Sequence, residues 1–116
     1  GVRQTFFEPC PHCGGAGMLR TAESLGLEVL RELHATLCAG RWQRLRVVLN
    51  PRVGFEIMNQ LRAQWTRLEE AHGARIEMQP DAGLPLAQWQ LWASQAGGDW
   101  TLKRSSEATQ HVRDNQ

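Results

Sequence analysis

Apolar residues recur at helical spacing in the segment 21–39. They stand three or four positions apart, at Leu25, Val29, Leu30, Leu33 and Leu37. That spacing places them on one side of an α-helix, with Leu33 buried in the middle of the apolar face. Thr21 precedes the stripe as an N-cap, and Gly40 follows it as a stop. The pattern predicts a helix over 21–39, in which Gly26 marks either close packing or a tolerated flaw.

The segment 44–73 begins with strand-like alternation and continues with helical spacing. The alternating apolar residues are Leu45, Val47 and Leu49. Asn50 followed by Pro51 is a strong helix start, because Asn can cap the first turn and Pro fits its first position. Helical spacing then persists to His72, with Trp65 expected in the core, and Gly73 ends it. We predict one long helix, or two helices with a bend near 59–62.

Alternation returns in the segments 75–79 and 88–93, which predicts two more strands separated by a loop. Residues 96–99 are turn-forming, and 100–103 would return as a further strand. Trp89 and Trp92 should then face opposite sides of the sheet. One of those sides must be buried by something, and because Trp is enriched at interfaces we expect a partner surface.

This order of elements predicts an α/β (α+β) fold, a small mixed sheet covered by helices. A Cys-x-x-Cys knuckle at Cys10 and Cys13 precedes it. Residues 1–20 would form the knuckle, 21–103 the small α/β domain, and the polar segment 104–116 a disordered tail. If the strands on either side of the 50–73 helical region are parallel, their crossover should be right-handed.

The candidate metal site is the stretch Cys10-Pro11-His12-Cys13-Gly14-Gly15-Ala16-Gly17. Two thiols three positions apart in a tight turn can bind one zinc ion. The motif occurs once, whereas a structural zinc site takes four ligands. The missing two ligands come either from this chain or from another one.

Within the chain, His34 and Cys38 are the candidates for the missing ligands, since residues four apart share one face of a helix. The competing interpretation makes Cys38 a buried small hydrophobe beside the apolar stripe. Two further interpretations of the Cys10 and Cys13 pair do not involve zinc. The cysteines could be a redox pair, although the glycines disfavour the helix that such a motif needs, or they could be reduced thiols in a glycine-rich turn.

Length and charge narrow the function classes. A chain of 116 residues is about one domain, and its net charge of +1 argues against a strongly electrostatic nucleic-acid clamp. Three cysteines make no disulfide framework, which favours a reducing, cytoplasmic setting. No membrane span or signal peptide is evident. The start at Gly1, without Met, suggests a piece of a longer protein.

A small basic patch at Arg41, Trp42, Arg44 and Arg46 could contact RNA by pairing with phosphate and stacking on a base. A charged edge strand would explain the same residues. The sequence shows few groups of residues that could act together in catalysis. Glu69 and Glu70 are adjacent, but on a helix their side chains point about 100° apart, so we expect them to form a solvated face.

The knuckle, followed by Glu23-Ser24 and by the Arg31-Glu32 pair on a helix, resembles the end of the catalytic half of ribonuclease E/G family endoribonucleases. The similarity covers about residues 8–93, where Val47-Val48-Leu49-Asn50-Pro51 and the run 68–78 also fit the family. The chain departs from the family after residue 93.

The resemblance implies a zinc link and small domain of an RNA-processing enzyme. Cys10 and Cys13 would be the ligands, pairing with the same two cysteines of a second copy around one shared zinc, and Cys38 would not take part. The small domain would build the homo-oligomer interface. RNA cleavage, with its Mg²⁺, would belong to a nuclease domain absent from this sequence, so no catalytic residue is expected here. The alternative is a self-contained zinc module that contacts RNA through Arg41, Trp42, Arg44 and Arg46.

Overall fold

The computed structural model describes residues 7–9 and 18–106, with side chains from residue 21 onward. The elements run in the order β1 Phe7–Pro9, β2 Met18–Arg20, α2 Ala22–Ala39, β3 Arg44–Leu49, α3 Pro51–Gln60, α4 Arg62–His72, β4 Arg75–Pro80, β5 Trp89–Ser94 and β6 Thr101–Ser105. β1 and β2 form an antiparallel pair, and the other strands form one sheet in the order β4-β3-β5-β6. Cys10, His12 and Cys13 fall outside the described residues.

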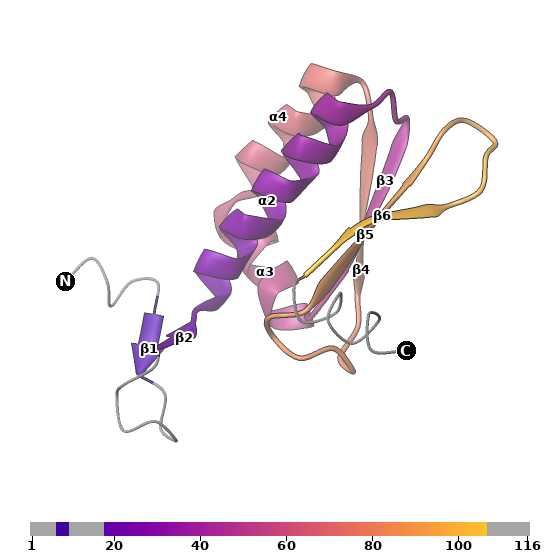
Figure 1. The fold of residues 1–116 in the computed structure, drawn as a ribbon. Coiled ribbons are helices and arrows are strands. Elements are labelled where there is room, and N and C mark those ends of the chain that lie inside the picture. Colours follow the sequence, from indigo (N-terminus) through magenta and orange to yellow (C-terminus); the bar gives the residue numbers. More distant parts are fainter. Residues whose placement is uncertain (1–6, 10–17, 107–116) are drawn as a thin grey trace.

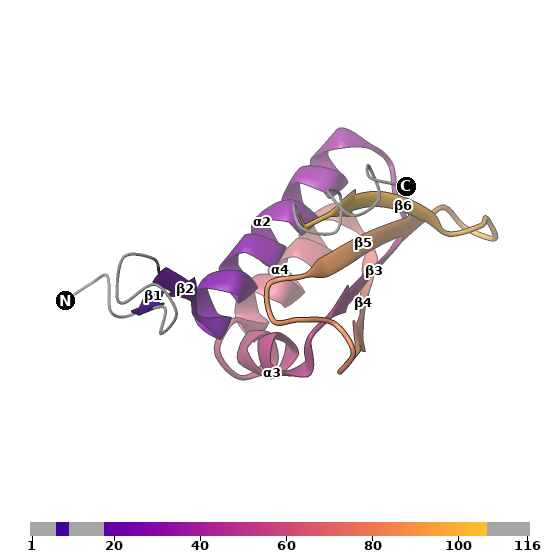
Figure 2. The ribbon, with the colours of Figure 1, turned by 60° about the horizontal axis from the view of Figure 1, so that its bottom comes forward.

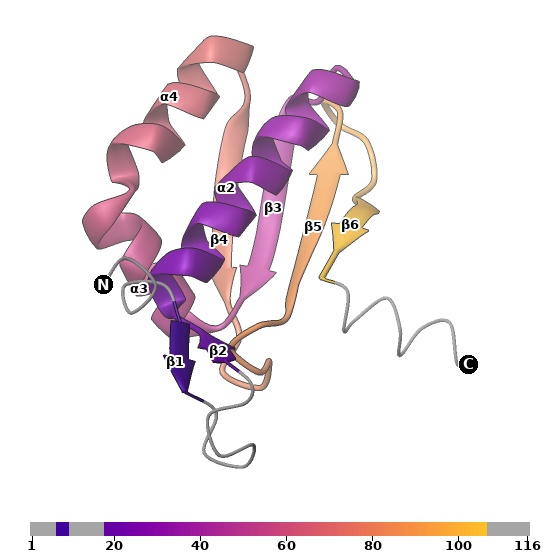
Figure 3. The same cartoon turned by 60° about the vertical axis from the view of Figure 1, so that its left-hand side comes forward.

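The described elements build two layers. α2 and α4 lie side by side over one face of the sheet, and α3 joins β3 to α4 at one end (Figures 1 and 2). Figure 3 shows α2 crossing in front of the strands, with β4 and β6 at the two edges of the sheet. β3 pairs parallel with β4 and antiparallel with β5. The predicted α+β fold, a small mixed sheet covered by helices, is confirmed.

Helix α2 forms where its apolar stripe predicted it. The Thr21 hydroxyl oxygen accepts a hydrogen bond from the Ser24 amide at 3.1 Å, which satisfies one donor of the first turn. Leu33 is fully buried. Gly26 marks close packing, since a Cβ there would stand 3.2 Å from both Ile57 and Leu61. Gly40 is extended rather than left-handed, and its small size makes room for the Trp42 ring.

The predicted strand and helix start at 44–51 are also confirmed. The Asn50 side chain accepts from the Arg52 amide at 2.9 Å, and Pro51 opens α3. The helical region is two helices, because Leu61 leaves helical geometry at φ −122°. Its buried side chain packs into the core, where Trp65 is also buried. Gly73 ends α4 in the left-handed conformation that glycine adopts most easily.

The C-terminal strand pair completes the sheet. Trp89 is buried on the helix side, while Trp92 is half-buried on the other side, as strand alternation predicted. β6 runs further than the expected 100–103 strand. Arg104 forms an ion pair with Glu32 of α2 at 2.8 Å, and the Ser106 amide donates to the Trp89 carbonyl. Residues 104–106 therefore belong to the packed domain, and the remainder of the predicted tail lies outside the described residues.

Candidate functional site: the open face of the sheet

The face of the sheet that no described helix covers carries a cluster of charged and aromatic side chains. Burial along β3 alternates, so Leu45, Val47 and Leu49 point toward the helices. Arg44 and Arg46 therefore point to the opposite, open face. In register, Arg46 stands between Glu77 of β4 and Trp92 of β5. The strand pairing thus gathers on one surface residues that are far apart in the sequence.

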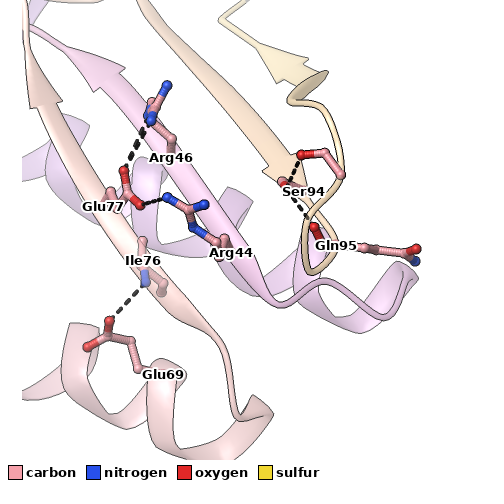
Figure 4. A network of polar contacts seen from close by, with 8 residues as sticks. Arg44, Arg46, Glu69, Ile76, Glu77, Ser94 and Gln95 are labelled. Carbon is pink, nitrogen blue, oxygen red and sulfur yellow. Dashed lines mark hydrogen bonds and ion pairs between the residues drawn. The ribbon is translucent and has the colours of Figure 1, made fainter.

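Glu77 bridges the two arginines of β3. Its carboxylate oxygens accept from Arg44 Nη2 at 2.7 Å and from Arg46 Nη2 at 3.2 Å (Figure 4). The hydrogen bond from Arg44, supported by the contact with Arg46, lowers the pKa of the Glu77 carboxyl. One carboxylate faces two guanidinium groups, so this part of the open face keeps a net positive charge.

Trp100 lies over the same two arginines. The guanidinium carbons of Arg44 and Arg46 stand 4.9 and 4.2 Å from the centre of its ring, within cation–π range. Beside this stack the open face is hollowed by a cavity of about 340 Å³, lined by Arg46, Val48, Gln79, Asp81, Gln90, Trp92 and Trp100. We call Arg44, Arg46, Glu77, Trp92 and Trp100 the open-face cluster.

The structure divides the predicted basic patch between two places. Arg44 and Arg46 belong to the open-face cluster, whereas Trp42 packs on Gly40 and against the core, with the Lys103 ammonium 5.0 Å from its ring centre. Arg41 is exposed, and its carbonyl accepts from the Gln95 side chain. The edge-strand explanation of these arginines is wrong, because β3 lies between β4 and β5.

Sequence reasoning missed Trp100 as the aromatic partner of the arginines. Trp42 is the aromatic residue that stands next to them in the chain, but its position on the strand-entry loop turns it toward the helices. Trp100 comes from the far end of the β5–β6 hairpin. The alternation that placed Trp92 opposite Trp89 was the available signal that an aromatic surface lies on the open side.

Two other sequence expectations are corrected. Cys38 is exposed rather than a buried small hydrophobe. Cys38 lies in the last turn of α2. Its sulfur stands 3.4 Å from His34 Nε2. Glu69 is not merely solvated, since its carboxylate accepts from the Ile76 amide at 2.8 Å and so fixes the start of β4 to α4.

Comparison with known proteins identifies the family. The profile of the RNase E/G thioredoxin-like domain matches residues 9–94, from the strand before the knuckle to the end of β5. The chain belongs to this family. The match leaves out β6, in agreement with a resemblance that fades after residue 93. Ribonuclease E of Haemophilus influenzae is 23% identical over 88 residues, which is 76% of this chain.

The region of the relative that aligns with this chain is short. The aligned region covers 9% of the length of the Haemophilus influenzae ribonuclease E. The chain is thus a member of a ribonuclease family and corresponds to a small part of such a protein. None of the described helices is long and apolar enough to cross a membrane.

Proposed function

We propose that this chain is the zinc link and small domain of a ribonuclease E/G-like endoribonuclease, and that it joins two copies of the enzyme. The observation that carries the proposal is the extent of the family match, which includes both the knuckle and most of the sheet domain. The link and the domain would therefore act as one unit in a protein of RNA processing and decay, in the cytoplasm.

The zinc ligands are Cys10 and Cys13 of each copy. Two thiolates leave zinc half coordinated, and a two-fold axis through the metal lets identical turns complete the tetrahedron. Zinc bound in this way would contribute greatly to assembly, since structural sites in small peptides bind with about 10–16 kcal/mol. Cys38 is outside this set.

The small domain would add a protein surface to the link. Its open-face cluster combines two arginines with two tryptophans, the residue types that interfaces favour. No described helix covers this face, so we assign it to the contact with a second copy. RNA cleavage and its Mg²⁺ would belong to the nuclease domain of the full enzyme.

Sedimentation velocity tests the link. The zinc-loaded chain should sediment as a dimer, and a chelator or Cys13→Ser should shift it toward the monomer. Cys38→Ser, which removes a thiol outside the proposed link, is the matched control and should leave the dimer intact. A dimer that persists in Cys13→Ser and in chelator would refute the shared zinc.

The second candidate is a zinc module that contacts RNA. The net positive charge and the half-buried tryptophan rings of the open-face cluster favour it, because basic surfaces with accessible aromatic rings pair with phosphates and stack bases. Fluorescence anisotropy with a labelled single-stranded RNA separates the candidates. RNA contact through this face requires Arg46→Ala to weaken binding more than Arg41→Ala, whereas an interface role requires Arg46→Ala to weaken the dimer.

A further inference from the structure

A group of metal-ligating side chains stands at the C-terminal end of α2. His34, Cys38 and His72 each offer one ligand atom, and these three atoms lie within 4.8 Å of one another. All three side chains are exposed, and they come from two different helices. We propose that they form a separate three-ligand site for a divalent transition-metal ion such as zinc.

The spacing of the ligand atoms fits such an ion. Zinc binds sulfur at about 2.3 Å and imidazole nitrogen at about 2.0–2.1 Å, which puts the two atoms about 3.5 Å apart in a tetrahedral site. The Cys38 sulfur and His34 Nε2 are 3.4 Å apart. The His72 ring meets the His34 ring edge-on with centres 5.9 Å apart. The ligand atoms lie within 4.8 Å of one another, so rotations of these exposed side chains need to shorten the longest separation by roughly 1.5 Å to reach tetrahedral spacing.

The position in the fold also favours a cation. Cys38 is in the last turn of α2 and His72 is the last residue of α4, and these two helix ends come together because β3 and β4, which follow them, start side by side (Figure 1). Each helix end carries about half a negative charge from its unpaired carbonyls. A metal ion placed there meets the negative ends of two helices.

The surrounding charge makes the thiolate essential. His34 and His72 also line an apolar groove of about 540 Å³ between α2 and α4, together with Arg31 and Arg67. These guanidinium groups oppose a cation, and Cys38 is the one ligand of the three that brings a negative charge when it loses its proton. The fourth coordination position faces solvent and takes a water molecule. The ion would tie α2 to α4 and raise the melting temperature.

Cobalt is the probe that isolates this site. The chain has three cysteines, so in a Cys10→Ser Cys13→Ser background Cys38 is the sole thiol. Titration with Co²⁺ should then give a thiolate-to-cobalt charge-transfer band that saturates at one ion per chain. Cys38→Ser should abolish the band, and His34→Gln or His72→Gln should each weaken binding by more than about tenfold. Gln64→Ala, in the same groove, is the control and should leave binding unchanged.

The proposal is overturned if no band develops, if the band saturates at one ion per two chains, or if His72→Gln binds as tightly as its background. A melting temperature that fails to rise with Zn²⁺ in the background chain also contradicts it. If the double serine change impairs folding, the same histidine and Cys38 changes in the otherwise unaltered chain give the metal count by native mass spectrometry. A dimer that persists in the Cys10→Ser Cys13→Ser background while this band is present would count against the shared link alone.

Discussion

The two faces of the four-stranded sheet differ in what covers them. On one face, Leu45, Val47 and Leu91 are fully buried under α2 and its neighbouring helices. On the other, Arg44 and Arg46 are held by one carboxylate and one indole ring. The side chains of the first face are buried against helices of the same chain, and this burial stabilises the fold. The second keeps charged and aromatic groups accessible, which is what a surface for a partner requires.

The largest effect should come from the covered face. Leu33→Ala removes a fully buried side chain and leaves a cavity, which should cost about 2–5 kcal/mol of unfolding free energy in urea melts. Phe55→Ala is the control, since Phe55 is 70% exposed and its loss should change stability by less than about 0.5 kcal/mol. A Leu33→Ala cost as small as that of the control would mean that the buried face is assigned wrongly.

A smaller effect is expected where α2 crosses α3. Gly26→Val would push a branched side chain against Ile57 and Leu61, which a Cβ alone already reaches at 3.2 Å, and overpacking of this kind costs about 1–3 kcal/mol. Ala35→Val introduces the same side chain at a half-exposed position of α2 and controls for its helix propensity. Equal thermal stability of the two variants would show that the helices can separate freely at Gly26.

The open face should give the smallest change in stability. Arg44→Met removes the main cause of the lowered Glu77 pKa, so that pKa should rise, as measured by NMR titration of the Glu77 carboxyl carbon. A depressed carboxyl pKa stabilises the fold above the ordinary value of 4.5, and the benefit is lost as the pH falls. At neutral pH, the free energy of unfolding of Arg44→Met should therefore be lower than that of the unaltered chain by about 0.2–1 kcal/mol.

The control for the open face is Arg52→Met, an exposed arginine on α3. It should leave the Glu77 pKa unchanged. An unaltered pKa in Arg44→Met would show that the ion pair with Glu77 does not persist in solution. A loss as large as that of Leu33→Ala would remove the distinction between the two faces.

The elements of this fold were predictable because their signals are local. The Leu stripe of α2, the alternation of β3 and the Asn50-Pro51 start each lie within one element. The break at Leu61 was expected near 59–62, but its exact place depends on packing. What local patterns could not give is which strands and helices lie side by side.

The same reason, that neighbours in space cannot be seen in local patterns, explains which residues of the candidate sites were not predicted. Trp100 reaches Arg46 only through the β5–β6 pairing, and His72 reaches His34 only because α2 and α4 end at the same place in the fold. Its neighbour Leu37 suggests that Cys38 is buried, but one step along a helix turns a side chain by about 100°, and Cys38 is exposed. The knuckle was found because its ligands are adjacent in sequence, and its zinc remains a prediction.

The most direct test of the shared link is the ratio of zinc to chains. Native mass spectrometry is best carried out on the Cys38→Ser His72→Gln variant, so that ions at the second site do not enter the count. The account predicts a dimer that holds one zinc ion, and loss of both the ion and the dimer when Cys13→Ser is added. A monomer that retains one zinc ion would contradict it.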